Sequence, residues 1–126
     1  MAKILIVDDD IDVVEACRLF LENEGHEIRA AYNRQEGMQA IKAQIPDLLI
    51  LDVIMEQPDD GIAMAQELRR TGFKKPILML TSISLVTGYK YGKDADLVPV
   101  DDFVEKPVKP DVLIAKVQEL LGKRGG

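Results

Sequence analysis

The sequence is short of several residue types, and each shortage narrows the class of protein. Its 126 residues include one cysteine, one histidine and no tryptophan. The single cysteine, Cys17, cannot form an intramolecular disulfide, which fits a reducing cytosol, and we expect it to be a small core residue. The single histidine, His26, argues against an internal histidine relay. Its place beside an edge strand predicts that it is exposed to solvent.

Long apolar runs and a basic surplus are also missing. No apolar run approaches the ~20 residues that are needed to cross a bilayer. Sixteen basic residues against 22 acidic residues leave a net charge of -6, which argues against a nucleic-acid-binding or anionic-membrane-binding surface. No region typical of a signal peptide precedes the first apolar segment. Together these features predict a cytoplasmic protein.

What the chain does contain is the composition of an ordinary globular domain. Hydrophobic residues make up 47% of the sequence and charged residues 30%, so the chain is not intrinsically disordered. This length fits one domain that buries roughly two-thirds of the surface of the unfolded chain. We expect a single domain over residues 1–122, followed by a flexible tail of residues 123–126.

Apolar, strand-like runs alternate with helical patterns along the whole chain. The expected strands cover residues 3–7, 26–31, 47–51, 76–80 and 102–105. The expected helices follow Asp10, cover residues 34–43, run from Asp59-Asp60-Gly61 to about residue 70, and begin after Pro110. Asp10 is expected to cap the first helix. Met38, Ile41 and Ile45 are the expected inner residues of the second.

The character of each strand predicts its place in a sheet. The first, third and fourth strands are continuous aliphatic runs, as strands that are covered on both faces should be. The second and fifth are more polar, as edge strands are. We therefore predict an α/β fold with a single doubly wound, flavodoxin-like, five-stranded parallel sheet in the order 2-1-3-4-5, with helices on both faces.

Four of the apolar runs are followed at once by residues that can do chemistry. In order along the chain these are Asp8-Asp9-Asp10, Asp52, Thr81-Ser82 and Lys106-Pro107. The carboxyl ends of parallel strands share one edge of the sheet, where such folds keep their ligand sites, beside the switch in strand order. This edge would hold carboxylates, a hydroxyl and an ammonium, which suit a divalent metal and a phosphoryl group.

Each of these residues also has a plainer interpretation. Taken alone, the acidic run is compatible with a solvated turn, Thr81 with a local backbone hydrogen bond, and Lys106 with a surface charge. The expected nearness of Asp52 to Asp8 and Asp9 favours a site, because several close carboxylates need a cation or a retained proton. Hard oxygen ligands suit Mg²⁺. A carboxylate at position 52 can also attack phosphorus and become an aspartyl phosphate.

The chain resembles the receiver domain of two-component response regulators over residues 4–121. The resemblance rests on the segments Ile4 to Asp10, Leu51 to Met55, Asp60-Gly61, Leu80 to Ser82 and Asp101 to Pro107. It implies a phosphoryl-accepting signalling switch that is not an enzyme, apart from slow loss of its own phosphoryl group. The implied phosphoryl donor is a histidine kinase or a phosphotransfer protein. The downstream partner stays unidentified.

The resemblance also implies a role for each site residue. Asp52 would be the phosphoacceptor and a Mg²⁺ ligand, Asp9 would bind Mg²⁺ directly, and Asp8 would do so largely through water. Ile54 would add its backbone carbonyl as a further metal ligand. Thr81 would turn to bond the phosphoryl group, and Lys106 would pair with Asp52 and then with a phosphoryl oxygen. Phe103 would be the switch aromatic, although a plain core aromatic is an alternative.

The sequence departs from the family pattern in three places. Glu56 stands where a proline is usual. Ile54 and Ile83 lie two residues beyond Asp52 and Thr81, and since neither can orient or deprotonate water, we predict slow self-dephosphorylation. The segment of residues 82–100 is longer than usual and poor in helix signals. It is either a tolerated insertion or a partner-specific surface with Tyr89 and Tyr91 as anchors.

Three other functions compete with this one. A phosphorylation-independent interaction module would keep the fold without the chemistry, and the intact site residues disfavour it. A Mg²⁺-dependent phosphatase of the haloacid dehalogenase type usually has a second acid two residues after its nucleophile, where this chain has Ile54. A dinucleotide-binding domain would have a glycine-rich turn after the first strand. These 126 residues leave no room for an output domain, so we expect a stand-alone regulator or an excised receiver.

Overall fold

The computed structural model describes residues 2–55, 60–81 and 100–125. Its strands are β1 (Lys3–Val7), β2 (Glu27–Ala31), β3 (Leu48–Asp52), β4 (Ile77–Thr81) and β5 (Asp102–Glu105). They form one sheet in the order β2-β1-β3-β4-β5, and every neighbouring pair is parallel. The predicted doubly wound order is therefore confirmed.

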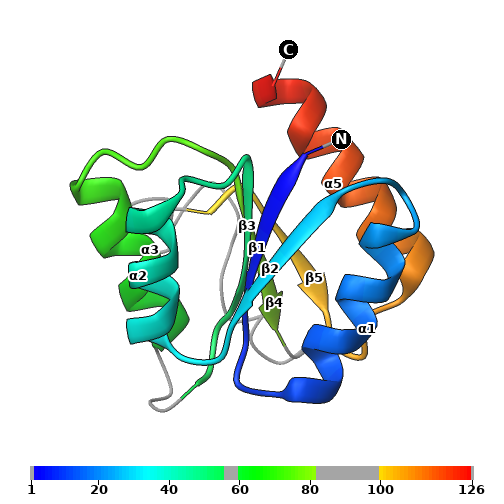
Figure 1. Cartoon of the computed structure of the whole chain (residues 1–126), viewed down its shortest axis with the longest axis horizontal. Helices are drawn as coiled ribbons and strands as arrows, with labels where there is room; N and C mark the ends of the chain where they lie inside the picture. Colours follow the sequence, from blue (N-terminus) through cyan, green and yellow to red (C-terminus); the bar gives the residue numbers. More distant parts are fainter. Residues whose placement is uncertain (1, 56–59, 82–99, 126) are drawn as a thin grey trace.

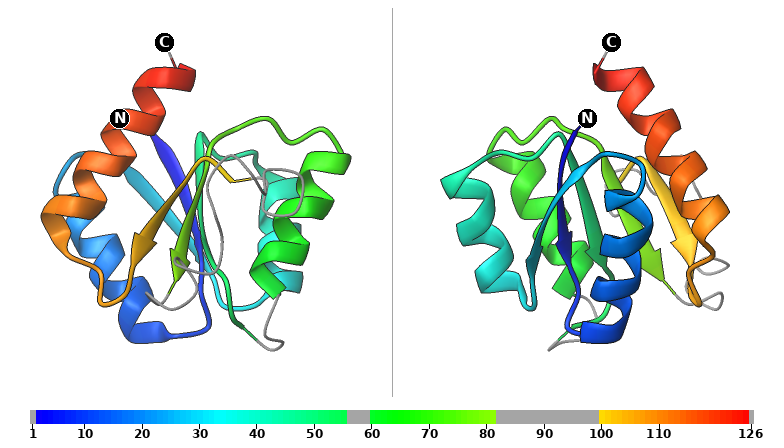
Figure 2. Two further views of the ribbon diagram at one scale, coloured as in Figure 1. Left: turned by 180° about the vertical axis from the view of Figure 1, so that it is seen from behind. Right: turned by 45° about the vertical axis from the view of Figure 1, so that its right-hand side comes forward.

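Four helices of the described part cover the sheet. They are α1 (Ile11–Glu22), α2 (Arg34–Ala43), α3 (Asp60–Arg70) and α5 (Pro110–Gly125). Helices α1 and α5 lie on one face of the sheet, and α2 and α3 lie on the other (Figure 1). The views in Figure 2 agree with this three-layer arrangement. Helix α5 continues into residues that the sequence assigns to a tail. No helix in this part of the chain is long and apolar enough to span a membrane.

The sheet separates two hydrophobic clusters, one under each pair of helices. Alternate strand residues point to opposite faces, so Leu5 and Leu49 join the cluster under α2 and α3, whereas Ile4 and Leu48 join the one under α1 and α5. Every residue of β3 and of β4 is buried, as the unbroken aliphatic runs predict. Cys17 lies fully buried in the second cluster, which confirms it as a core residue.

Local signals in the sequence set the helix ends as expected. The side chain of Asp10 accepts hydrogen bonds from the backbone N–H groups of Asp12 and Val13, which confirms it as the N-cap of α1. Gly25 follows this helix with a φ of 90°, a conformation that residues with a Cβ rarely adopt. These caps fix the direction in which the chain leaves β1 and enters β2.

Two side chains lie where the sequence did not predict. Ile45 is 62% exposed, because α2 ends at Ala43 and the extended backbone that follows breaks the helical spacing. His26 is half-buried instead of exposed, because the start of β2 lies beside the start of β1. The backbone N–H of Ala2 donates to His26 Nδ1 at 3.1 Å. Burial lowers the pKa of His26.

Two strand boundaries also differ from the prediction in a way that matters for the site. Strands β3 and β4 each begin and end one residue later than expected, so Asp52 and Thr81 are the last residues of their strands. The ladder continues because Asp52 pairs with Leu80 and Thr81 pairs with Glu105. Both side chains therefore start from a hydrogen-bonded backbone. Glu56, Ile83, Tyr89, Tyr91 and the expected irregular segment before residue 100 lie outside the described residues.

Candidate functional site

The carboxyl edge of the sheet brings together side chains from four strands. Asp8 follows β1, and the pairing of Val7 with Leu51 places it beside Asp52 at the end of β3. Thr81 ends β4, and Lys106 follows β5, where its backbone N–H donates to the carbonyl of Thr81 at 2.8 Å. Asp8 is fully buried and Asp52 is 5% exposed. The site is therefore anchored in the core.

Three carboxylates form a tight cluster at this edge. Asp8, Asp9 and Asp52 each offer an oxygen atom, and these atoms all lie within 4.8 Å of one another. Asp9 is the exposed member, and the other two are buried. Close carboxylates repel one another unless a cation or a proton compensates them. The cluster thus favours cation binding on its solvent-facing side.

Asp8 offers one oxygen atom that lacks a hydrogen bond. Its Oδ1 accepts from the backbone N–H of Asp10 at 2.9 Å. Its Oδ2 is buried and accepts no hydrogen bond from the described residues, although the ammonium of Lys106 lies 3.0 Å away as an ion partner. The ammonium therefore compensates this oxygen in the metal-free protein, and the oxygen keeps a lone pair for a second partner. A hydrated divalent cation that prefers oxygen ligands has the right chemistry for that second partner.

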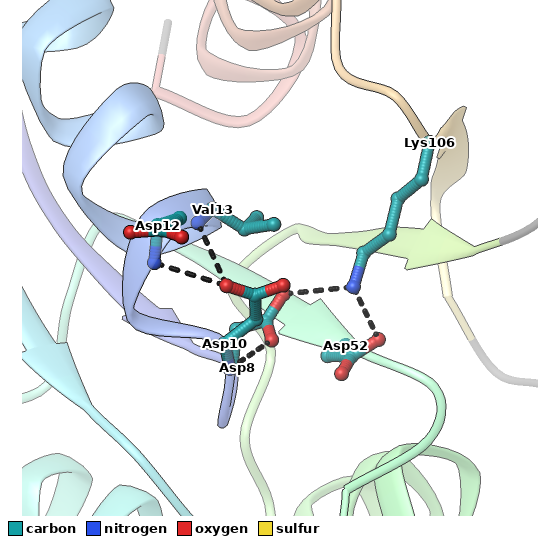
Figure 3. Close-up of polar contacts among 6 residues, drawn as sticks. All are labelled: Asp8, Asp10, Asp12, Val13, Asp52 and Lys106. Carbon is teal, nitrogen blue, oxygen red and sulfur yellow. Dashed lines mark hydrogen bonds and ion pairs between the residues drawn. The ribbon is translucent and has the colours of Figure 1, made fainter.

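Lys106 bridges the two buried carboxylates. Its Nζ lies 3.0 Å from Asp8 Oδ2 and 3.1 Å from Asp52 Oδ1 (Figure 3). Burial lowers the pKa of Lys106, but the charges of Asp52 and Asp8 more than offset this, and the net direction is upward. The ammonium therefore stays charged at neutral pH. The sequence placed Lys106 opposite Asp52 but missed its contact with Asp8. The peptide bond between Lys106 and Pro107 is cis.

The surroundings of Asp52 disfavour its charged form. Burial, followed by the negative charge of Asp8, raises the pKa of Asp52 to about 7, even though Lys106 acts in the opposite direction. In the absence of a metal, the carboxyl group thus holds a proton far more readily than an exposed aspartate does. A cation bound beside Asp8 and Asp9 would favour the carboxylate, which is the form that can act as a nucleophile.

An open cavity of about 270 Å³ lies over these groups. It is lined by acidic residues, by Thr81, by Lys106 and by residues that follow β3. One water occupies roughly 30 Å³ in the liquid, so this volume accommodates a phosphoryl group together with a hydrated cation. Ile54 lines the cavity and is 47% exposed. All the candidate metal ligands except the buried Asp8 line this cavity.

Phe103 takes no part in this cavity. It is buried in the hydrophobic cluster under α2 and α3, and it pairs with Met79 across the ladder of β4 and β5. Phe103 is therefore a core aromatic residue. The next residue of β5, Val104, packs in the hydrophobic cluster on the opposite face of the sheet. A role for Phe103 as a switch stays a prediction.

Gly61 is a residue whose role at the site the sequence analysis missed. Its backbone N–H donates to the carbonyl of Val53 at 2.8 Å, which brings the first turn of α3 against the end of β3. A Cβ at this position would lie 1.9 Å from the carbonyl oxygen of Asp52. Only glycine allows this approach. The Asp60-Gly61 pair marked the helix start, but nothing in the sequence pointed to the contact with Asp52.

Comparison with known proteins finds relatives over most of the chain. Residues 4–118 match the family described as the response regulator receiver domain. The chain is 37% identical over 119 residues to the response regulator MprA of Mycobacterium ulcerans, and an MprA of Mycobacterium tuberculosis matches at the same identity. Each match covers 94% of this chain and 50% of the relative. The chain thus spans about half the length of these curated relatives.

Solved structures show the same fold over nearly the whole chain. The receiver domain of NtrX from Brucella abortus superposes with a TM-score of 0.83 at 30% identity and covers 94% of this chain and 98% of its own. A two-component response regulator from Clostridium difficile gives a TM-score of 0.82 at 29% identity, and both chains are covered completely. Because the match to this family extends over residues 4–118, the chain belongs to the receiver-domain family of response regulators.

Proposed function

We propose that this domain is a phosphoryl-accepting signalling switch and that Asp52 is its phosphoacceptor. The observation that supports this best is the position of Lys106, whose ammonium contacts both Asp8 and Asp52 at the floor of an open cavity. A carboxylate that is buried, next to a fixed cation and still reachable from solvent is suited to covalent catalysis. An ordinary structural ion pair would not need the cavity.

The acidic cluster suits Mg²⁺ as the cofactor of this reaction. Asp8, Asp9 and Asp52 would hold the ion together with the backbone carbonyl of Ile54, with Asp8 acting largely through water. The three carboxylate oxygens, which lie within 4.8 Å of one another, support this assignment. When bound, Mg²⁺ supplies neutralisation of negative charge on the phosphoryl oxygens.

The chain's own residues then account for the transfer. One oxygen of Asp52 attacks the phosphorus of a phosphohistidine, an O–P bond forms, the P–N bond breaks, and the electron pair leaves with the imidazole nitrogen. Lys106 and Thr81, which both line the cavity, would bind the oxygens of the transferred group. Asp52 reacts as the carboxylate, because a protonated carboxyl group is a poor nucleophile.

Phosphorylation changes the charge at the end of β3, and this change drives the proposed switch. A carboxyl group with at most one negative charge becomes a dianionic acyl phosphate. Thr81 and Lys106 are drawn toward it, and the space that Thr81 leaves allows Phe103 to move. The surface around β5 and α5 then exchanges between two populated arrangements.

The proposed phosphoryl donor is a histidine kinase or a histidine phosphotransfer protein, and the receiver passes the signal to a downstream protein. Direct contact with nucleic acid or a membrane forms no part of the proposal. The domain acts as a switch and not as a turnover enzyme, although we propose that it slowly loses its own phosphoryl group. Its cytoplasmic location stays a prediction from the sequence.

Phosphorylation by a small donor tests the proposal directly. The protein is incubated with Mg²⁺ and acetyl phosphate and analysed by mass spectrometry for a single alkali-labile phosphoryl adduct. We expect the adduct with the wild type and none with Asp52→Asn, which keeps the shape of the side chain but removes the nucleophile. Absence of an adduct with the wild type would leave the phosphorylation-independent interaction module as the better account. Steady release of phosphate from a generic phosphate ester would instead favour the phosphatase.

A further inference from the structure

The position of Lys106 depends on a short strand at the edge of the sheet. Strand β5 has four residues and lies at the end of the strand order, with β4 as its neighbour in the sheet. Lys106 follows directly after its last residue, Glu105. A strand held along one side is weakly protected against a shift of register, and such a shift would displace Lys106 from Asp52.

Asp101 holds the start of β5 against β4. Its Oδ2 accepts a hydrogen bond from the backbone N–H of Ile77 at 2.8 Å. Its own backbone N–H donates to the carbonyl of Ile77 at 2.9 Å. Asp101 thus adds one further pair of hydrogen bonds between the segments of β4 and β5, directly before the first residue of β5. This pair of hydrogen bonds lies at the opposite end of β5 from Lys106.

Arg69, in the last turn of α3, holds Asp101 in place. Its Nη2 donates to Asp101 Oδ2 at 2.9 Å, and the side chains of the pair are only 22% and 17% exposed. Its Nη1 donates to the carbonyls of Phe73 and Lys75 at 2.9 and 2.8 Å, and its guanidinium lies 5.8 Å from the centre of the Phe73 ring. Because the carbonyls of Phe73 and Lys75 hold the guanidinium beside Asp101, Arg69 anchors the start of β5.

A second ion pair holds the same end of β5 from the other face of the sheet. Lys116 of α5 donates to Asp102 Oδ2 at 2.8 Å. Successive strand residues point to opposite faces, so Asp101 contacts α3 while Asp102 contacts α5. The start of β5 is therefore fixed between two helices.

Helix α3 connects this anchor to the site itself. Its first turn lies against the backbone of Asp52 and Val53 through Gly61, and its last turn carries Arg69. Strand β5 then returns from Asp101 to Lys106, whose ammonium contacts Asp52. Helix α3 thus contacts the end of β3 that carries Asp52 with its first turn, and the start of the strand that leads to Lys106 with its last turn.

We propose that Arg69 and Asp101 are positioning residues for Lys106. Arg69 acts through Asp101 to set the register and the depth of β5, and so it sets the distance from the ammonium to Asp8 and Asp52. Neither residue touches the reacting atoms. The proposal deepens the proposed function and rests on it for the phosphorylation measurement, but the geometry of Lys106 can be measured without any phosphoryl transfer.

The kinetic test measures the rate of Asp52 phosphorylation by acetyl phosphate and Mg²⁺ in a double-mutant cycle. Arg69→Met should lower the rate roughly tenfold, because small displacements of a catalytic group have large effects. Asp101→Asn keeps an oxygen acceptor but loses the charge that pairs with Arg69, so it should lower the rate by a smaller factor. In a Lys106→Met background the same substitutions should cause no further loss, since the group that they position is gone. Arg34→Met is the matched control, because it removes the ion pair from Arg34 of α2 to Glu67 of α3, the helix that also carries Arg69, and leaves β5 untouched.

A second measurement separates this proposal from the proposed function. The backbone N–H of Lys106, which donates to Thr81, should exchange with deuterium severalfold faster in Arg69→Met and Asp101→Asn than in the wild type or Arg34→Met. Asp101→Asn keeps an oxygen acceptor for Ile77, so it tests the idea even where Arg69→Met does not fold. Equal losses of rate with and without Lys106, or unchanged exchange at Lys106, would overturn the positioning role. A wild type that accepts no phosphoryl group would overturn the proposed function instead, and the exchange result would still decide this inference.

Discussion

The ammonium of Lys106 lies 3.1 Å from Asp52 Oδ1, although 54 residues separate the two in the sequence. The same nitrogen lies 3.0 Å from Asp8 Oδ2, so one cation compensates two buried carboxylates. This arrangement makes the site a balance of charges that is sensitive to pH, to a bound metal and to substitution. Each of these sensitivities leads to a measurable expectation.

Removal of the ammonium should destabilise the metal-free protein and strengthen metal binding. In Lys106→Met the carboxylates of Asp8 and Asp52 lose their cation, and we expect a loss of about 1–3 kcal/mol in the free energy of unfolding in EDTA. Mg²⁺ should bind severalfold more tightly by calorimetry, because Nζ no longer competes for the same oxygens. Lys109→Met, at a nearby exposed lysine, is the control. Weaker Mg²⁺ binding in Lys106→Met would contradict the expectation.

The stability of the metal-free protein should depend on the protonation of Asp52. Its pKa is raised from an ordinary value of 3.8 to about 7, first by burial and then by Asp8. The folded protein therefore holds this proton more tightly than the unfolded chain does. The stabilisation that results is fully present below pH 3.8 and is lost as the pH rises through about 7.

Urea unfolding in EDTA between pH 5 and about 8.5 would reveal this dependence when the wild type is compared with Asp52→Asn. Asp52→Asn lacks the titrating group. Its free energy of unfolding should therefore exceed that of the wild type by an amount that grows with pH and reaches about 1–3 kcal/mol above pH 7. Saturating Mg²⁺ should remove most of the difference by favouring the carboxylate. A difference that stays constant over the whole pH range would show that Asp52 titrates normally.

The close approach of α3 to β3 should make position 61 intolerant of any side chain. A Cβ in Gly61→Ala would meet the Asp52 carbonyl oxygen at 1.9 Å, and backbone atoms cannot move aside as a flexible side chain can. We expect a loss of about 2–3 kcal/mol in the free energy of unfolding, together with weaker Mg²⁺ binding. Gly122→Ala is the matched control, because a Cβ there meets nothing within 4 Å and alanine favours the helix. Equal effects of the two substitutions would contradict the packing argument.

The lifetime of the phosphorylated form should depend on two isoleucines, one at the cavity and one close to Thr81 in the sequence. Ile54 is half-exposed at the cavity, and Ile83 follows Thr81 by two residues. Neither can orient or deprotonate an attacking water, so the wild type should lose its phosphoryl group slowly. Replacement of both with glutamine should shorten the lifetime of the adduct severalfold, as measured by mass spectrometry over time. Replacement of both with valine keeps the apolar character and should leave the lifetime unchanged, and an unaltered lifetime in the glutamine variant would refute the idea.

Much of the fold follows from local patterns that a reader can find in the sequence. Unbroken aliphatic runs such as Ile77 to Leu80 predict buried parallel strands, and Asp10 and Gly25 mark the ends of the first helix. These signals depend on a few neighbouring residues, so they can be recognised without knowledge of the rest of the chain. The prediction that Ile45 is an inner residue was wrong, because the apolar pattern extends beyond residue 43, where α2 ends.

The sequence predicted which residues form the candidate site, but not how these residues contact one another. The residue types at the strand ends and the rule that parallel strands share an edge were enough to group Asp8, Asp9, Asp52, Thr81 and Lys106. The contact of Lys106 with Asp8, the fit of Gly61 against Asp52 and the anchor from Arg69 to Asp101 have no local signature. Each depends on atoms from elements that are distant in the sequence.

The sequence alone determined the order of strands and helices and the set of chemical groups at one edge of the sheet. It did so because hydrophobic periodicity and capping are properties of neighbouring residues. Only the tertiary structure decided the charge balance of the site, including the raised pKa of Asp52 and the choice of Lys106 as a shared counter-ion. Desolvation and Coulomb interactions depend on burial and on distances of a few ångströms between separate strands, and folding alone sets those distances.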